Sequence, residues 1–233
     1  MNINCNLPIN PLGYGQTGYN IFMQLARKHK VALWPIGNIA IPDGSKMAQN
    51  VIQEAINRQS SFDYHAPSLR IWHQFEMAQR IGKGMAVGMP IFELDTFDYR
   101  EINHLASLDR VFVCSEWAKG VVESQVKNAT VRVVPLGVDT DVFKQDLPNH
   151  HEDGKFIFLN IGKWEIRKGH DILVEAFNAD FDKKDNVELW MMNHNPFLSD
   201  EQEKEWHRMY KNSKLGEKIK ILPRVQTAGE IAA

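Results

Sequence analysis

Short apolar runs alternate with longer amphipathic segments along this chain. The apolar runs are rich in β-branched and aromatic residues, which favour strands, whereas the segments between them space apolar residues as a helix does. Regular alternation of strands and helices predicts a mostly parallel sheet covered by helices, which is the α/β fold class. The predicted strands are residues 3–7, 31–34, 69–72, 86–92, 110–114, 131–134, 156–161, 187–192 and 218–222.

Three of the amphipathic segments are predicted to be helices. Residues 19–28 place apolar side chains at positions i, i+3, i+4 and i+7, the spacing of one helix face. Residues 116–125 follow Ser115, whose hydroxyl is suited to capping a helix N-terminus. A third helix is predicted shortly after residue 169. Its expected buried side consists of Ile172, Leu173, Ala176 and Phe177.

A cationic loop lies between strand 156–161 and this third helix. It begins at Gly162 and carries Lys163, Arg167 and Lys168. In open α/β sheets, ligands bind at the carboxyl ends of strands, next to helix N-termini that attract anions. Cations beside a helix N-terminus are unfavourable unless an anion is bound there. The loop therefore predicts a diphosphate-binding group, with a solvated basic turn as the alternative.

Two segments resemble motifs of the retaining glycosyltransferases of family 4, which have the two-domain GT-B fold. Residues 135–143 match the P-x-G-V-D-x-x-x-F segment that closes the first domain of that family, at Pro135, Gly137, Val138, Asp139 and Phe143. The loop after strand 156–161 matches the family segment whose two cations hold the pyrophosphate of a sugar nucleotide. The matching positions there are Gly162, Lys163, Lys168 and Gly169.

The resemblance implies a GT-B architecture and a transferase activity. Residues 1–147 are expected to form a complete Rossmann-like, acceptor-side domain, 148–155 a linker, and 156–233 part of a Rossmann-like donor domain. The implied reaction moves a hexose-type sugar from a nucleoside diphosphate to an acceptor with retention, without a metal or other cofactor. A non-catalytic nucleotide-sugar-binding protein of the same fold is the alternative. The nucleotide base, the sugar and the acceptor, whether a sugar, glycan or lipid, are left open.

The second domain is expected to be truncated. It is short for a doubly wound domain, and it lacks the acidic Glu-x₆₋₇-Glu type of motif that binds the donor in the family. Thr227 and Glu230 have capping-box spacing, but so few residues follow that the helix they open is expected to fray. The chain as given is accordingly expected to be inactive or weakly active, and to self-associate through an unpaired sheet edge.

The sequence contains a Gly-x-Gly-x-x-Gly pattern at Gly13, Gly15 and Gly18. It predicts a loop between the first strand and the first helix. A nicotinamide- or flavin-dependent oxidoreductase is one interpretation, although residues 8–12 separate the pattern from its strand and the second strand ends without an acidic residue. The resemblance instead implies a loop that lines the substrate cleft, and a tight turn is the third possibility.

Two carboxylates and a histidine are the candidate catalytic residues. Glu93 and Asp95 follow an apolar strand, and alternation along a strand would point them the same way. The resemblance implies an acidic residue or histidine here, against the reacting sugar. His73 ends the preceding strand and is the other candidate, with a structural histidine as the alternative.

Charge, cysteine content, acidic residues and hydropathy give no indication of nucleic-acid binding, disulfides, a metal site or a membrane span. The net charge of −2 gives no reason to expect nucleic acid as a partner, and the two cysteines form no disulfide or metal pattern. Asp139 and Asp141 imitate an Asp-x-Asp metal site but lie inside the junction motif, and the acidic and histidine run 150–153 is expected to be solvated. With no apolar run of membrane-spanning length and no leader pattern, a cytoplasmic location is expected.

Overall fold

The computed structural model describes residues 1–42, 44–144, 154–225 and 228–232. The chain divides into two compact units, Met1–Thr140 and Asp141–Ala233. Each unit contains one parallel β-sheet with helices packed on it. The α/β class is therefore confirmed. The predicted linker 148–155 falls largely on residues outside the described ranges.

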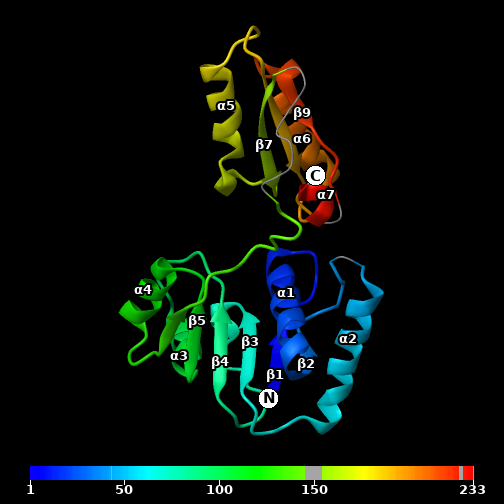
Figure 1. Cartoon of the computed structure of the whole chain (residues 1–233). Coiled ribbons are helices and arrows are strands. Elements are labelled where there is room, and N and C mark those ends of the chain that lie inside the picture. The colour runs from blue at the N-terminus through cyan, green and yellow to red at the C-terminus, as the bar shows by residue number, and fades with distance from the viewer. Residues whose placement is uncertain (43, 145–153, 226–227, 233) are drawn as a thin grey trace. The chain divides into compact units, whose positions relative to one another are not determined.

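Unit 1 is built on a six-stranded parallel sheet with the strand order β2-β1-β3-β4-β5-β6 (Figure 1). Its α-helices lie between successive strands in the chain, which is what a parallel sheet requires of its crossovers. The elements are β1 (Asn2–Leu7), α1 (Gly13–Lys28), β2 (Lys30–Pro35), α2 (Lys46–Asn57), β3 (Ser68–Trp72), β4 (Ala86–Pro90), α3 (Tyr99–Ala106), β5 (Arg110–Val113), α4 (Glu116–Gln125) and β6 (Val131–Val133). Short 3₁₀ turns, η1 (Arg58–Ser61) and η2 (Gln74–Glu76), follow α2 and β3.

The core of unit 1 has two apolar clusters. One joins β1 and β2 to α1 and α2, with Leu7, Phe22 and Leu33 fully buried. The other joins β5 and β6 to α3 and α4 around Leu105 and Val122. Burial of this kind on both faces explains why apolar residues dominate most of these strands.

Unit 2 contains a three-stranded parallel sheet with the order β7-β8-β9. Its buried core includes Trp164, Phe177, Met191 and Tyr210. The elements are β7 (Phe156–Gly162), η3 (Ile166–Lys168), α5 (His170–Asp180), β8 (Val187–Asn193), α6 (Asp200–Lys211), η4 (Gly216–Lys218), β9 (Ile219–Ile221) and α7 (Ala228–Ala232).

Strand β7 has one paired edge and an apolar surface. Among the described residues it pairs only with β8, in parallel. Four of its apolar side chains are exposed, and the segment between Phe156 and Gly162 carries no charge that would discourage pairing with another strand. These side chains are Phe156 (60% exposed), Phe158 (38%), Leu159 (52%) and Ile161 (45%).

All nine predicted strands are present, each within two residues of its expected bounds. Helix α4 has the predicted bounds, and the Ser115 hydroxyl accepts a hydrogen bond from the Ala118 N–H at 3.2 Å. Helix α7 forms at the predicted place, although Thr227, its expected cap, lies outside the described residues. No helix in the described ranges is both long and apolar enough to cross a membrane.

Two local expectations were wrong. Helix α1 begins at Gly13, six residues before the predicted start, so the glycine pattern is helical and not a loop. The buried side of α5 consists of His170, Val174 and Phe177, while Ile172 is 66% exposed. Phe177 is buried and Leu173 partly buried, as predicted, whereas Val174 and the polar His170 were not expected on the buried side.

Candidate functional site

The strand order of unit 1 reverses direction between β1 and β3. From β1 the chain passes to β2 on one side and then crosses back to β3 on the other side. Ligands of open α/β sheets bind at the carboxyl ends of strands at such a reversal, because the two following connections leave in opposite directions. The residues that follow β1 and β3 are therefore the first place to look for a site.

The structure brings Tyr14 and His73 together at this reversal. Tyr14 lies in the first turn of α1, after β1, and His73 directly follows β3. The Tyr14 hydroxyl lies 3.1 Å from His73 Nδ1, and it also donates a hydrogen bond to the carbonyl of Ile91, which follows β4. The two rings are 4.6 Å apart between centroids. The helix after β1 and the connections after β3 and β4 thus meet at one tyrosine.

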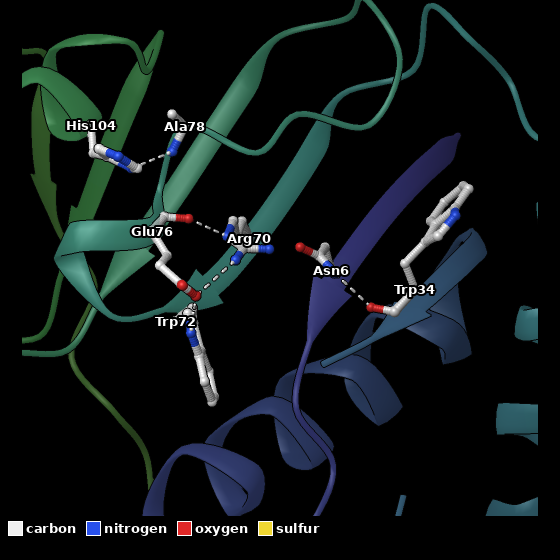
Figure 2. Close-up of polar contacts among 7 residues, drawn as sticks. All are labelled: Asn6, Trp34, Arg70, Trp72, Glu76, Ala78 and His104. Carbon is white, nitrogen blue, oxygen red and sulfur yellow. Dashed lines mark hydrogen bonds and ion pairs between the residues drawn. The ribbon is translucent and has the colours of Figure 1, made fainter. Parts of the chain in front are cut away.

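A polar network fixes the turn that carries His73 (Figure 2). The Glu76 carboxylate accepts a hydrogen bond from Trp72 Nε1 at 2.8 Å and lies 3.8 Å from the Arg70 guanidinium. Arg70 Nε also donates to the Glu76 carbonyl at 2.7 Å, so the start and end of the turn are tied together. The imidazole of His73 stacks on the Phe75 ring at 5.0 Å. These contacts hold the side chain of His73 in one place.

Burial governs the protonation of both members of the pair. It lowers the pKa of His73 below 6.5, against a smaller opposing effect of the Glu76 carboxylate. Burial, with smaller contributions from Glu93 and Cys114, raises the pKa of Tyr14 to about 12. A neutral imidazole and a neutral phenol are therefore the dominant forms near pH 7.

Glu93 and Asp95 follow β4 but do not lie on it. The strand ends at Pro90, two residues before its predicted end, so strand alternation does not set the directions of the two side chains. Glu93 is exposed and close enough to influence Tyr14 electrostatically. Asp95 is also exposed, and its backbone carbonyl accepts a hydrogen bond from Gln125 Nε2 on α4 at 3.0 Å. Of the two carboxylates, Glu93 is the one that the structure associates with the Tyr14–His73 pair.

The three glycines of α1 have different surroundings. A Cβ on Gly18 would lie 2.1 Å from the Pro8 carbonyl oxygen, and one on Gly15 would lie 2.2 Å from Asn10 Oδ1. A Cβ on Gly13 would meet nothing within 4 Å. Gly15 and Gly18 are thus required for close packing of α1 on the segment that follows β1, and this packing places Tyr14 beside His73.

In unit 2 the cationic loop lies where the sequence predicts it, between β7 and α5. Gly162 is the last residue of β7, and Lys163 follows it with its ammonium 4.8 Å from the centroid of the Phe197 ring. Arg167 forms an ion pair with Glu165 at 3.1 Å, and Lys168 is exposed at the end of η3. Gly169 then adopts a left-handed conformation (φ 72°) and is the N-cap of α5, which begins at His170. The loop therefore presents its cations next to a helix N-terminus.

Buried hydrogen bonds anchor this loop from beneath. His170 Nδ1 accepts from the Glu165 N–H at 3.3 Å, while His170 Nε2 lies 3.1 Å from Asn160 Oδ1 on β7. Asn195 Nδ2 donates to the Trp164 carbonyl at 2.9 Å. The loop is thus attached to both β7 and the segment after β8, so its cations project from a fixed backbone.

Four contributors to these sites were not identified from the sequence. They are Tyr14 and Glu76 in unit 1, and His170 and Phe197 in unit 2. Tyr14 lies inside the glycine pattern, but its partner His73 is 59 positions away. His170 directly follows the cationic motif, and its contact with Asn160 depends on how the loop folds back on β7. Phe197 is 71% exposed beside Lys163, which is unusual for an aromatic side chain.

No group of three or more His, Cys, Asp or Glu side chains suited to a metal ion occurs among the residues that the structure describes. Asp139 and Asp141 are exposed near the boundary of the two units. The run 150–153 lies outside the described residues.

Comparison with solved structures identifies the fold. No protein-family model and no curated protein matches this chain. The Anabaena protein Alr3699/HepE in complex with UDP-glucose is similar with a TM-score of 0.65 and 14% identity, over 97% of this chain and 69% of that one. Sucrose-phosphate synthase (tll1590) from Thermosynechococcus elongatus is similar with a TM-score of 0.67 and 14% identity, over 100% and 72%.

A second structure of Alr3699/HepE, in complex with UDP, gives a TM-score of 0.67 at 15% identity, over 100% of this chain and 71% of that one. Likeness at such low identity speaks for the fold and not for the activity. The chain has the GT-B type of fold, with two Rossmann-like α/β units, as the sequence motifs suggested.

Proposed function

We propose that this protein is a glycosyltransferase that uses a nucleoside diphosphate sugar as its donor. The observation that carries the proposal is the cationic loop at the carboxyl end of β7, beside the N-terminus of α5. The fold adds support, because the solved structures that resemble this chain include Alr3699/HepE in complex with UDP or UDP-glucose. The finer proposal is transfer of a hexose-type sugar with retention of configuration and without a metal ion. The acceptor is a sugar, glycan or lipid.

The loop is suited to a departing diphosphate. As the bond between the sugar and the diphosphate breaks, negative charge grows on the diphosphate, and fixed cations stabilise that charge without reorganising. Lys163 and Lys168 are proposed to do so, with Arg167 and the N–H groups at the start of α5 assisting. The Lys163 ammonium lies over the Phe197 ring in an exposed cation–π contact. Because such a contact contributes little free energy, replacing it with a contact to a phosphate is expected to be favourable.

The residues at the strand reversal of unit 1 are proposed to act on the reacting groups. His73 and Glu93 would accept a hydrogen bond from a hydroxyl of the sugar or the acceptor, or stabilise the positive charge that develops on the sugar ring. Their proximity to Tyr14 supports treating them as one group. Asp95 is the weaker candidate because its contacts tie it to α4.

The proposal also includes self-association through the exposed edge of β7.

Calorimetry with UDP tests the clamp directly. Lys168→Ala, and to a smaller extent Lys163→Ala, is expected to weaken binding by about 1.5 to 3 kcal/mol, the usual loss for a charge-assisted contact. That loss corresponds to roughly ten- to hundred-fold in Kd. Lys183→Ala is the matched control, because Lys183 is an exposed lysine of the same unit that pairs with Glu217.

Unchanged affinity in both loop variants would rule out the clamp. A screen of nucleotide sugars for hydrolysis and transfer then separates the two forms of the proposal. Donor turnover supports the transferase, whereas binding with no turnover of any donor supports a non-catalytic nucleotide-sugar-binding protein of the same fold.

A further inference from the structure

The hydrogen bonds of Tyr14 determine which nitrogen of His73 carries the proton. We propose that Tyr14 is a positioning residue that holds His73 in the Nδ1–H tautomer, so that Nε2 presents a lone pair to a substrate hydroxyl. The tautomer follows from the geometry of unit 1 alone. Only its use on a sugar or acceptor hydroxyl rests on the proposed transferase activity.

The assignment is a matter of counting protons. A phenol hydroxyl has one proton to donate, whereas a backbone carbonyl can only accept. The Tyr14 hydroxyl contacts the Ile91 carbonyl, so its proton must point there. Towards His73 Nδ1, 3.1 Å away, the same oxygen then acts as the acceptor. The Nδ1 atom must therefore be the donor, and a neutral imidazole with a proton on Nδ1 has none on Nε2.

The surroundings keep the imidazole neutral and in place. Trp72 and Phe75 contact the His73 ring at 4.8 and 5.0 Å between centroids, and the Tyr14 ring lies 4.6 Å away. The charged groups that act on the pair are the carboxylates of Glu76, on the turn after β3, and Glu93, after β4. Burial outweighs Glu76 in its effect on the His73 pKa, which lies below its ordinary value.

The Nε2 atom is left for a ligand. Within the described residues, His73 Nε2 makes no hydrogen bond, because the side-chain contact of the ring is through Nδ1. Free imidazole prefers the other tautomer, with its proton on Nε2, so a specific acceptor at Nδ1 is needed to reverse it. An unprotonated Nε2 fits a donor group such as a sugar hydroxyl, and it would repel a phosphate oxygen.

Long-range ¹H–¹⁵N spectra of the imidazole rings test the assignment. At about pH 8.5, two units above the ordinary histidine pKa, all rings are neutral enough to show their tautomers. His73 is expected as Nδ1–H. His104 and His170 are built-in controls and are expected as Nε2–H, because their Nδ1 atoms accept backbone N–H groups from Ala78 and Glu165.

Tyr14→Phe removes the hydroxyl and keeps the ring. It is expected to move His73 to Nε2–H, or to a mixture, without affecting His104 or His170. Tyr99→Phe, at a tyrosine that is 82% exposed, should change none of the three. An Nε2–H signal for His73 in the unaltered protein would overturn the proposal, and that measurement is decisive even if the Tyr14 variant folds poorly. The proposal is equally overturned if Tyr14→Phe leaves the tautomer unchanged.

Turnover supplies the second readout. If a donor and acceptor are found, Tyr14→Phe is expected to lower kcat by about tenfold or more with little change in KM for the donor. Loss of kcat without a change of tautomer would count against the assignment. Because the spectra need no substrate, absence of transfer in the unaltered protein would reject the transferase proposal and leave the tautomer result standing.

Discussion

At the scale of single residues, His170 shows how a buried histidine supports the cationic loop. His170 is 2% exposed, and its imidazole contacts Asn160 on β7 and the Glu165 N–H in the loop. Its backbone carbonyl accepts a hydrogen bond from the Tyr210 hydroxyl of α6 at 2.5 Å. A backbone N–H can only donate, so His170 Nδ1 must be unprotonated in this arrangement. Protonation of the ring would break the contact that holds the loop.

This arrangement makes the stability of unit 2 depend on pH. Burial lowers the pKa of His170 below 6.5, with Asp171 and Glu165 opposing the shift. The unfolded chain then binds a proton near pH 6.5 that the folded chain resists. The stabilisation is complete above that pH and is lost as the pH falls below it.

We predict that His170→Gln flattens the dependence of unit 2 unfolding on pH below about 6.5, at the cost of some stability at every pH. Urea unfolding followed by tryptophan fluorescence measures this, because Trp164, Trp190 and Trp206 lie in unit 2 and Trp164 is 5.2 Å from the His170 ring. His73→Gln is the control, since His73 also has a lowered pKa but belongs to unit 1. An unchanged slope in the His170 variant would mean that another group titrates.

Candidate residues that lie together in one motif could be predicted from the sequence, whereas contacts between residues far apart in the sequence could not. Lys163 and Lys168 could be identified because they share one short loop after one strand. Tyr14 and His73 are separated by 59 positions, and only the parallel pairing of β1 with β3 brings their connections together. That pairing depends on strand order, which the alternation of strands and helices does not specify.

At the scale of elements, helix α1 shows why strand existence was easier to predict than a helix start. Most of the strands are short segments rich in apolar and β-branched residues, and that signal is local. The first turns of α1 contain Gly13, Gly15 and Gly18, and glycine is a poor helix former, so the segment was interpreted as a loop. Close packing on residues 8–10 outweighs that intrinsic preference.

This packing predicts opposite effects of alanine at two glycines of the same helix. Gly18→Ala is expected to destabilise unit 1 by at least about 2 kcal/mol, because its Cβ would meet the Pro8 carbonyl, which belongs to the backbone and cannot rotate away. Gly13→Ala is expected to leave stability unchanged or to raise it by up to about 1 kcal/mol, because the space there is open and alanine favours the helix.

Urea denaturation of both variants measures the difference. Equal stability of the two would show that α1 shifts freely on the sheet. In that case the helix could not hold Tyr14 in a fixed position.

At the scale of the whole molecule, the protein consists of two units with buried cores of their own. Unit 2 is the smaller, and an ionic cluster ties its strands together. Glu188 on β8 accepts hydrogen bonds from Lys155 at 2.9 Å, Lys220 at 2.8 Å and Trp190 at 2.7 Å. Although burial opposes ionisation, these partners lower the pKa of Glu188 to about 2. The carboxylate is only 14% exposed, so its contacts are poorly screened by water.

A domain with its own core usually unfolds as its own cooperative unit, so calorimetry of the whole chain should resolve two transitions. Glu188→Gln is expected to cost about 1 to 3 kcal/mol and to lower only the transition of unit 2, by on the order of 10 °C. Gly18→Ala should lower only the transition of unit 1. Glu217→Gln is the matched control in unit 2, because Glu217 is 60% exposed and its pair with Lys183 should contribute little.

A single transition that both Glu188→Gln and Gly18→Ala lower would mean that the two units unfold as one. The loop that carries Lys163 and Lys168 would then depend for its stability on the packing of α1, and a loss of UDP binding in unit 1 variants could not be assigned to a direct contact.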